Sequence, residues 1–160
     1  MKSNLDLSAL ELFDKNWALL TSGDIGNHNS MTISWGQMGT LWHKPVVTTF
    51  VRFNRHTFSF INKNEYFVVS FFPKEFHNSL VIMGTKSGKD VNKDNLANLT
   101  PIEHNNVTLY KEAQVSLVCK KIYFDDLKFE NMPKVVVEKL YKGQQGHRMF
   151  IGEVVEIVEN

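Results

Sequence analysis

The sequence contains only one cysteine, so the chain can form no internal disulfide and has no thiol pair for redox exchange. This cysteine, Cys119, lies in an apolar run typical of a strand, and we expect a buried packing residue rather than a reactive thiol. Long apolar runs are also missing, because none approaches the roughly 20 residues that a membrane-spanning helix needs. The chain begins Met-Lys-Ser-Asn-Leu-Asp, without the apolar core of a signal peptide. These absences predict a cytoplasmic protein with no membrane partner.

An excess of charge of one sign is missing as well. The formal net charge is +1, whereas a protein that binds the phosphate backbone of DNA or RNA normally carries a basic surface. A β-barrel that binds nucleic acid through its aromatic residues and residues 86–93 is therefore the weakest of the functions considered. The composition predicts no nucleic-acid partner.

The common motifs of phosphate, dinucleotide and metal sites are missing too. There is no P-loop, no G-x-S-x-G nucleophile elbow and no G-x-G-x-x-G fingerprint, and residues 36–39 are too short and in the wrong context for the last of these. None of the six histidines has a metal-ligand spacing or a cysteine partner. We therefore expect no metal site and no Rossmann domain for a nicotinamide.

What the sequence does contain is a series of short β-rich runs with a few helical segments between them. At 160 residues it fits one domain, residues 1–160, with a sizeable core. Regular strand–helix–strand alternation is missing, so six or seven strands with short helices favour an antiparallel β-barrel over a parallel sheet. The expected strands are residues 17–21, 31–35, 46–53, 66–72, 107–111, 114–124 and 149–158. The expected helices are residues 8–13, capped by Ser8, then 55–63, 76–83, 94–99, capped by Asp94, and 133–141, with a loop at 24–29.

Residues 29–57 carry the strongest functional signal. Within them, residues 31–35 alternate hydroxyl and apolar side chains, which predicts a strand with one polar and one apolar face. The next β-rich run leads into two arginines three residues apart, Arg52 and Arg55. Hydroxyl and backbone groups suit a polar ring edge, and guanidinium groups suit a phosphate. The pattern fits a planar, partly apolar ligand with an anionic tail; on residue type alone, two arginines in ordinary surface ion pairs are the alternative.

A second candidate for anion binding supports the first. Thr57 lies in the first turn of the expected helix 55–63, where free backbone N–H groups and the helix dipole favour a phosphate. Residues 87–89 read Ser-Gly-Lys, and a glycine beside a hydroxyl and an amine lets the backbone approach an anion closely. A helix cap and a solvated turn are the alternative interpretations of these two segments.

Four segments together resemble the flavin reductase-like proteins, and flavoredoxins in particular. They are NSMTISWGQMGTLWHKPVVTTFVRFNRHT at 29–57, FVVSFFP at 67–73, KSGKD at 86–90 and GHRMFIGEV at 146–154, in family order over nearly the whole chain. The resemblance implies a mainly β fold, an FMN-binding split β-barrel of the Greek-key antiparallel type that works as a homodimer. One departure is Phe53, which stands where many relatives carry proline and is expected to shift the chain between the two arginines.

The resemblance also implies the residues of the site. Asn29, Met31, Thr32, Ser34 and Trp35 are expected beside the ring and ribityl chain of FMN, and Arg52, Arg55, Thr57, Ser87, Gly88 and Lys89 near its phosphate. His147, which by itself would be an ordinary surface histidine at a strand start, is expected close to the flavin as the catalytic residue.

The function that follows is that of an FMN-dependent oxidoreductase. NAD(P)H or a ferredoxin-type protein would donate electrons, and free flavin, a metal complex or a redox protein would accept them. Because no Rossmann domain is encoded, a nicotinamide would have to stack in the flavin pocket itself. The alternative is a non-catalytic FMN-binding electron carrier or sensor.

Overall fold

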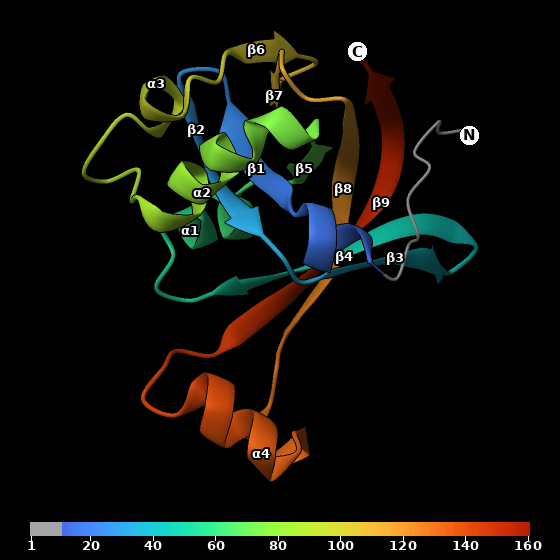
Figure 1. Cartoon of the computed structure of the whole chain (residues 1–160). Helices are drawn as coiled ribbons and strands as arrows, with labels where there is room; N and C mark the ends of the chain where they lie inside the picture. Colours follow the sequence, from blue (N-terminus) through green and yellow to red (C-terminus); the bar gives the residue numbers. More distant parts are fainter. Residues whose placement is uncertain (1–10) are drawn as a thin grey trace.

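The computed structural model describes residues 11–160, and its largest element is a seven-stranded antiparallel sheet (Figure 1). The strand order is β2-β1-β5-β8-β9-β4-β3, so β2 and β3 form the two edges, and a separate hairpin pairs β6 with β7. This confirms the expected antiparallel, mainly β architecture. The strands are β1 Ala18–Asp24, β2 Asn27–Ile33, β3 Gly36–Leu41, β4 Lys44–Arg52, β5 Tyr66–Phe71, β6 Pro101–His104, β7 Val107–Tyr110, β8 Val115–Asp126 and β9 His147–Glu159.

Three helices lie together beside the β2 edge of the sheet (Figure 1): α1 His56–Lys63, α2 His77–Thr85 and α3 Lys93–Ala97. A second helical segment projects from the far end of β8 and β9 and consists of η3 Phe129–Asn131, α4 Lys134–Val136 and the π-helical turn η4 Val137–Tyr141. Shorter turns are η1 Leu12–Asn16 and η2 Lys74–Phe76. Within residues 11–160, the longest apolar helical stretch falls short of what a membrane crossing requires.

The core lies on both faces of β5, as its uninterrupted apolar run predicts. Phe67 and Phe71 pack in the largest apolar cluster, whereas Val68, which points to the other face, packs in another one. A strand covered on both faces needs no polar alternation, which explains the continuous run. Cys119 is fully buried in the largest cluster, and burial raises the pKa of its thiol, so it is a packing residue.

Three features of the first half of the chain differ from the expectation. β2 begins at Asn27, so the expected loop 24–29 is a two-residue turn, and it ends at Ile33, which leaves Trp35 beyond the strand. The sequence prediction missed β3 altogether. β3 and β4 are joined at Trp42 and His43, both with positive φ. Hairpin turns of that conformation usually carry glycine or asparagine, so no residue pattern indicated a turn here.

The remaining differences concern helix ends and one small strand pair. Asn92, not Asp94, caps α3, since its side chain accepts a hydrogen bond from the Asn95 N–H. α2 ends at Thr85, after the expected stop at Gly84, and the β6 strand was not expected. The capping role proposed for Ser8 lies outside the described residues.

Candidate functional site

The sheet register brings the first arginine and the late histidine together. In the β4–β9 pair Arg52 lies directly opposite His147. Phe53 then donates its N–H to the Gly146 carbonyl at 3.3 Å, which continues the pairing past the strand end and which a proline could not do. A turn closed by the Arg55 N–H and the Arg52 carbonyl at 3.1 Å leads into α1. The departure at Phe53 therefore locks the segment between the two arginines onto β9.

A cavity of about 170 Å³ opens beside this pairing, and we call it the ring pocket. It lies between the end of β2, the end of β4 and the start of β9. Its apolar walls come from Met31, Trp35 and Phe50, and its charged groups are both arginines. The residues that line it are Met31, Thr32, Ile33, Ser34, Trp35, Phe50, Arg52, Arg55 and His147, so six of the predicted binding residues and the predicted catalytic residue come together here.

His147 is buried in this pocket, with 6% of its surface exposed. Burial, together with the positive charges of Arg52 and Arg55, lowers the pKa of His147 to about 4, so the imidazole is neutral at pH 7. Its Nδ1 lies 2.9 Å from the hydroxyl of Tyr141, and burial raises the pKa of that hydroxyl, which therefore keeps its proton.

The contact between Nδ1 and the Tyr141 hydroxyl is compatible with either tautomer of the neutral imidazole. Where the Tyr141 hydroxyl donates its proton to Nδ1, the imidazole proton is on Nε2. Since Nε2 makes no hydrogen bond within residues 11–160 and does not count among their buried unpaired atoms, it is accessible from the ring pocket. In that tautomer the pocket contains a neutral N–H donor, and the indole of Trp35 lies 5.2 Å from the imidazole between ring centroids.

Arg52 makes contacts within the protein that the sequence did not predict. Its guanidinium donates to the carbonyls of Gln145 at 2.7 Å and Leu140 at 3.1 Å, and it lies over the Tyr141 ring. These contacts tie the end of η4 and the loop before β9 to β4. Arg52 therefore positions Tyr141 and His147, and the phosphate contact expected of it stays a prediction.

A second cavity, of about 110 Å³, adjoins the ring pocket, and we call it the phosphate pocket. It is formed by the N-terminus of α1 and the loop that follows α2, and it shares Met31 and Arg55 with the ring pocket. α1 has no side-chain cap, so its first N–H groups are available for a ligand. Arg55 makes one long hydrogen bond, 3.3 Å to the Gly84 carbonyl, and keeps its other donors for a ligand.

Asn29 joins the three segments that form the phosphate pocket. Its amide donates to the Thr57 hydroxyl at 2.7 Å, and both residues are buried. The Thr57 hydroxyl still has its own proton to donate. On its other side Asn29 meets Gly88 so closely that a Cβ at residue 88 would lie 2.1 Å from its Oδ1. The predicted residues Asn29, Thr57 and Gly88 therefore form one packed unit, and Ser87 lies beside Gly88 in the same loop.

Replacing Gly88 by alanine should push the loop away from Asn29 and widen the phosphate pocket. We expect Gly88→Ala to weaken the binding of a phosphate-bearing ligand by roughly tenfold, which corresponds to about 1.4 kcal/mol. Gly39→Ala is the matched control, because a Cβ there meets nothing within 4 Å. Ligand titrations of the two variants check this, and equal affinities would show that the close approach has no functional part.

Lys93 is a residue of this site that the sequence prediction missed. It lines the phosphate pocket, only 7% of its surface is exposed, and its ammonium donates to the carbonyls of Ser30 and Met83, the latter at 3.1 Å. Burial lowers the pKa of Lys93 to about 8, with Arg55 acting in the same direction and Asp94 against it. A signal was available: a lysine in the first turn of a helix opposes the helix dipole, so it requires another reason to be there.

Three predicted residues differ in their placement. Thr32 uses its hydroxyl to donate to the Leu80 carbonyl in α2, at 2.5 Å. Ser34 is exposed at the rim of the ring pocket. Lys89 lies outside the phosphate pocket, on a neighbouring cavity. Within residues 11–160, no three histidine, cysteine or acidic side chains are grouped as metal ligands would be.

Comparisons with known proteins agree on the architecture. The family model described as flavin reductase like domain matches residues 10–160. Comparison with the curated proteins gives no match. Among solved structures, flavoredoxin from Methanosarcina acetivorans has 19% identity and a TM-score of 0.71, covering 100% of this chain and 75% of its own. Flavoredoxin of Desulfovibrio vulgaris (Miyazaki F) has 18% identity and a TM-score of 0.70, covering 100% and 77%.

Two further structures have the same fold. A split barrel domain protein from Shewanella frigidimarina NCIMB 400 has 19% identity and a TM-score of 0.72 over 91% of this chain and 67% of its own. An FMN-binding protein from Thermus thermophilus has 19% identity and a TM-score of 0.67 over 99% and 80%. These similarities confirm the expected split-barrel fold.

Proposed function

Because the chain belongs to the flavin reductase-like domain family, we propose that it is an FMN-dependent oxidoreductase. The observation that carries the proposal is the continuity of the two pockets, which share Met31 and Arg55. A site with an apolar, aromatic half and an anion-binding half fits a ligand with a planar ring at one end and a phosphate at the other. Flavoredoxins and an FMN-binding protein with the same fold support FMN as that ligand.

The residues present fit FMN at both ends. Arg55, the N-terminus of α1 with Thr57, and the backbone at Ser87 and Gly88 would hold the phosphate, and Lys93 adds a positive charge beneath it. Met31 and Trp35 would line the ring. When bound, FMN supplies the transfer of hydride and electrons, and the protein supplies binding, orientation and electrostatics.

His147 would act as a neutral hydrogen-bond donor at the ring pocket. The Tyr141 hydroxyl at Nδ1 would hold the ring in place, and Arg52, on β4, would fix the loop before β9 by its hydrogen bond to the Gln145 carbonyl. A fixed donor stabilises negative charge that develops on an oxygen or nitrogen atom in front of it, because it needs no reorganisation during the reaction. His147 would therefore favour reduction without exchanging its own proton.

NAD(P)H or a ferredoxin-type protein is the proposed donor, and a small molecule or redox protein the acceptor. The alternative, a non-catalytic FMN-binding carrier or sensor, has the same pockets and differs in turnover. Steady-state oxidation of NADH and NADPH by the FMN-loaded protein, with free flavin as acceptor, separates the two. Turnover would support the enzyme. Stable FMN binding without turnover, with NADH, NADPH and a reduced ferredoxin alike, would support the non-catalytic carrier or sensor instead.

We also propose that the protein is a homodimer. Several large apolar side chains are exposed along β3, β8 and the projecting helical segment, notably Trp42 at 60%, Phe124 at 51% and Phe129 at 41%. The projecting segment extends away from the sheet (Figure 1). Exposed aromatic residues on an extended arm are a feature of surfaces that a second subunit covers.

The dimer should have a mass near twice the 18.5 kDa of the chain. Light scattering at micromolar concentration measures this directly. Phe124→Asp should shift the mass toward the monomer, because an unpaired carboxylate in an apolar interface is costly. Val91→Asp, on a loop at the other side of the molecule, is the control. A wild-type monomer that binds FMN would contradict the proposal.

A further inference from the structure

Lys93 is a buried positive charge for which the described part of the chain supplies no negative partner. Only 7% of the residue is exposed, and none of the ion pairs among residues 11–160 includes it. Its ammonium donates to the carbonyls of Ser30 on β2 and Met83 in α2. These carbonyls occupy two of its three N–H groups but do not neutralise the charge. A buried ion without a counter-ion is costly, so its retention here indicates an anion from outside the chain.

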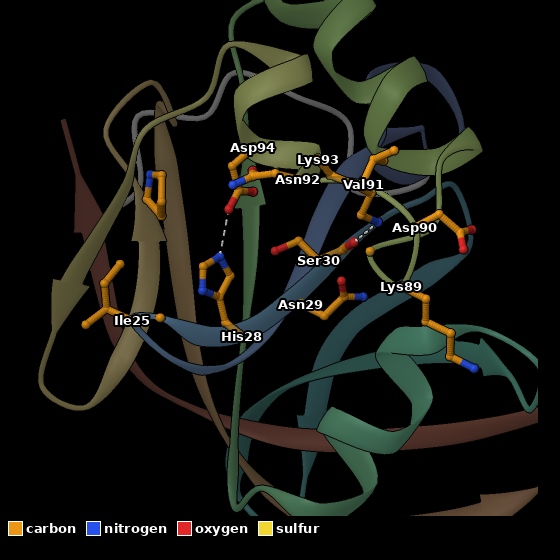
Figure 2. A pocket seen from close by; sticks show the side chains of 13 residues that line it. Ile25, His28, Asn29, Ser30, Lys89, Asp90, Val91, Asn92, Lys93 and Asp94 are labelled. Atoms are coloured by element: carbon orange, nitrogen blue, oxygen red, sulfur yellow. Dashed lines mark hydrogen bonds and ion pairs between the residues drawn. The ribbon is translucent and has the colours of Figure 1, made fainter.

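The position of Lys93 shows where this anion would lie. Lys93 lines the phosphate pocket and also a larger neighbouring cavity of about 690 Å³, so it belongs to the wall between them, together with Asn29 and Gly88. Figure 2 shows Lys93 from the larger cavity, where it reaches from the start of α3 to Ser30. An anion in the phosphate pocket would therefore lie against the buried ammonium. The proposed function uses this charge but does not explain how the protein holds it.

Asp94, the next residue along the chain, is held apart from Lys93. One of its oxygens accepts from the Tyr110 hydroxyl at 2.7 Å, and the other lies 3.0 Å from Nε2 of His28. Figure 2 shows the carboxylate turned toward His28 and away from the Lys93 ammonium. Burial opposes ionisation of Asp94, but hydrogen bonds with His28 and Tyr110 and nearby positive charge outweigh it and hold the pKa of Asp94 below its usual range. Asp94 is therefore ionised and supplies negative charge near Lys93 without pairing with it.

The same hydrogen-bonded group continues to the strand that carries a carbonyl partner of Lys93. Tyr110 gives its one hydroxyl proton to Asp94, so the Ser30 hydroxyl, 2.8 Å away, donates to Tyr110. The Thr21 hydroxyl in turn lies 2.9 Å from that of Ser30 and donates to it. Since α3 has only five residues, it depends on such contacts for its position. This buried chain of bonds therefore fixes both Lys93 and the carbonyl to which it donates.

The other groups around Lys93 make its charge sensitive to pH. They come from the start of α1, the loop after α2, α3 and β2, and they are Arg55, His56, Lys86, Lys89, Asp90, Asp94 and His28. Burial lowers the pKa of Lys93 to about 8; Asp94 opposes this change and Arg55 adds to it. Burial and the charges of Lys89 and Lys93 lower the pKa of His56, which is therefore neutral from pH 7 upward. Lys93 thus loses its charge just above neutral pH when the pocket holds no anion.

We propose that Asp94 is a positioning residue for the phosphate pocket: its bonds to Tyr110 and His28 anchor α3, and its negative charge supports the Lys93 ammonium, which selects a doubly charged phosphate. An anion in the pocket stabilises the ammonium. Above neutral pH the protein therefore takes up a proton from solvent when it binds the phosphate. That this phosphate belongs to FMN rests on the proposed function, whereas the requirement of Lys93 for an anion does not.

The ratio of FMN affinity to riboflavin affinity, from titrations of the apoprotein between pH 7 and pH 9, tests the role of Lys93. Both flavins have the same ring, so ionisation of the ring cancels in the ratio. Free protein has lost most of the Lys93 proton at pH 9 and regains it in the FMN complex. The ratio is therefore highest below pH 8 and should fall about fivefold to tenfold by pH 9.

Lys93→Met should lower this ratio at pH 7 and make it independent of pH. The matched control is Lys120→Met, because Lys120 lies on β8 and pairs with Glu65 at 3.1 Å. The control should follow the wild-type profile. A ratio that stays constant in wild type between pH 7 and pH 9, or that falls equally in Lys93→Met, would overturn the proposal.

Two further variants separate the charge of Asp94 from its anchoring contacts. Asp94→Asn keeps an oxygen that can accept from Tyr110 but removes the negative charge, so the ratio should begin to fall at a lower pH than in wild type. Tyr110→Phe keeps the charge and loses the 2.7 Å hydrogen bond, so the ratio should be lower at every pH and fall over the wild-type range. An unshifted profile in Asp94→Asn would contradict its role.

Calorimetry on the wild-type apoprotein needs no substitution. Binding at pH 8.5, measured in two buffers with different heats of ionisation, counts the protons taken up, and we expect about half a proton more with FMN than with riboflavin. Equal uptake would contradict the proposal. Sulfate, which stays doubly charged throughout this range, distinguishes the two proposals. If the protein binds no FMN but its sulfate affinity falls from pH 7 to pH 9 and does so only with Lys93 present, this inference stands and the proposed function fails. If FMN binds with a constant ratio, only this inference fails.

Discussion

Arg55→Ala should weaken FMN binding by roughly tenfold to a hundredfold, since a hydrogen bond to a charged group is worth about 1.5–3 kcal/mol. Arg55 lies between the ring and phosphate pockets, and within residues 11–160 most of its donors have no protein partner. Riboflavin has the same ring without the phosphate, so its affinity should barely change. Fluorescence titration of the apoprotein with both flavins measures the difference.

Arg52→Ala is the matched control for this prediction. Because Arg52 donates to the Gln145 and Leu140 carbonyls, its loss should loosen the loop before β9 and affect FMN and riboflavin alike. The ratio of the two affinities should therefore fall in Arg55→Ala and stay constant in Arg52→Ala. A ratio that falls only in Arg52→Ala would move the phosphate to the other arginine.

His147→Ala should keep FMN bound but slow its reduction by the donor by roughly tenfold to a hundredfold. Removing one fixed donor from a stabilising site typically costs about 10²–10³ in rate, and we expect less here because the ring pocket is open to solvent. Stopped-flow reduction at matched FMN occupancy and saturating donor is the measurement. His104→Ala serves as the control, and equal rates in His147→Ala and wild type would return His147 to a structural role.

Tyr141→Phe tests how His147 is held. Without the hydroxyl, Nδ1 has no donor and the imidazole can carry its proton on either nitrogen, so the rate should fall partway toward that of His147→Ala.

The reduction rate in wild type should show no inflection near the ordinary histidine pKa of 6.5, because the pKa of His147 is about 4. Between these values the unfolded chain binds the proton and the folded chain does not, so this group lowers stability as the pH falls from 6.5 toward 4.

The parts of the fold that the sequence predicted are those with a local signal. The strand β5 is recognisable from consecutive apolar side chains alone, and α1 from Phe58 and Ile61, which lie on one face of a helix. β3 has no such signal: most of its residues are exposed, and its turn is made by Trp42 and His43 rather than by residues typical of a turn. β3 is held in place by its pairing with β4, and such pairing cannot be predicted from the residues of β3 alone.

The candidate site divides in the same way. Most of its members lie in residues 29–57 and 87–89, close enough in sequence for a pattern to be seen. Lys93 and Tyr141 act through contacts with residues distant in the chain, Ser30 and Arg52. The role of Arg52 also depended on carbonyls that only the folded chain brings near it. Long-range contacts of this kind produce no local sequence pattern, so reasoning from residue types missed the roles of Lys93 and Tyr141 and the carbonyl contacts of Arg52.

Anaerobic titration of the FMN-loaded protein with NADH, NADPH and a reduced ferredoxin in turn, followed at the flavin absorbance, tests the central claim most directly. The account predicts that the protein holds FMN in a fixed ratio to the chain and that at least one donor bleaches it faster than it bleaches free FMN. A protein that binds no FMN, or whose FMN is reduced by every donor no faster than FMN in solution, would contradict it.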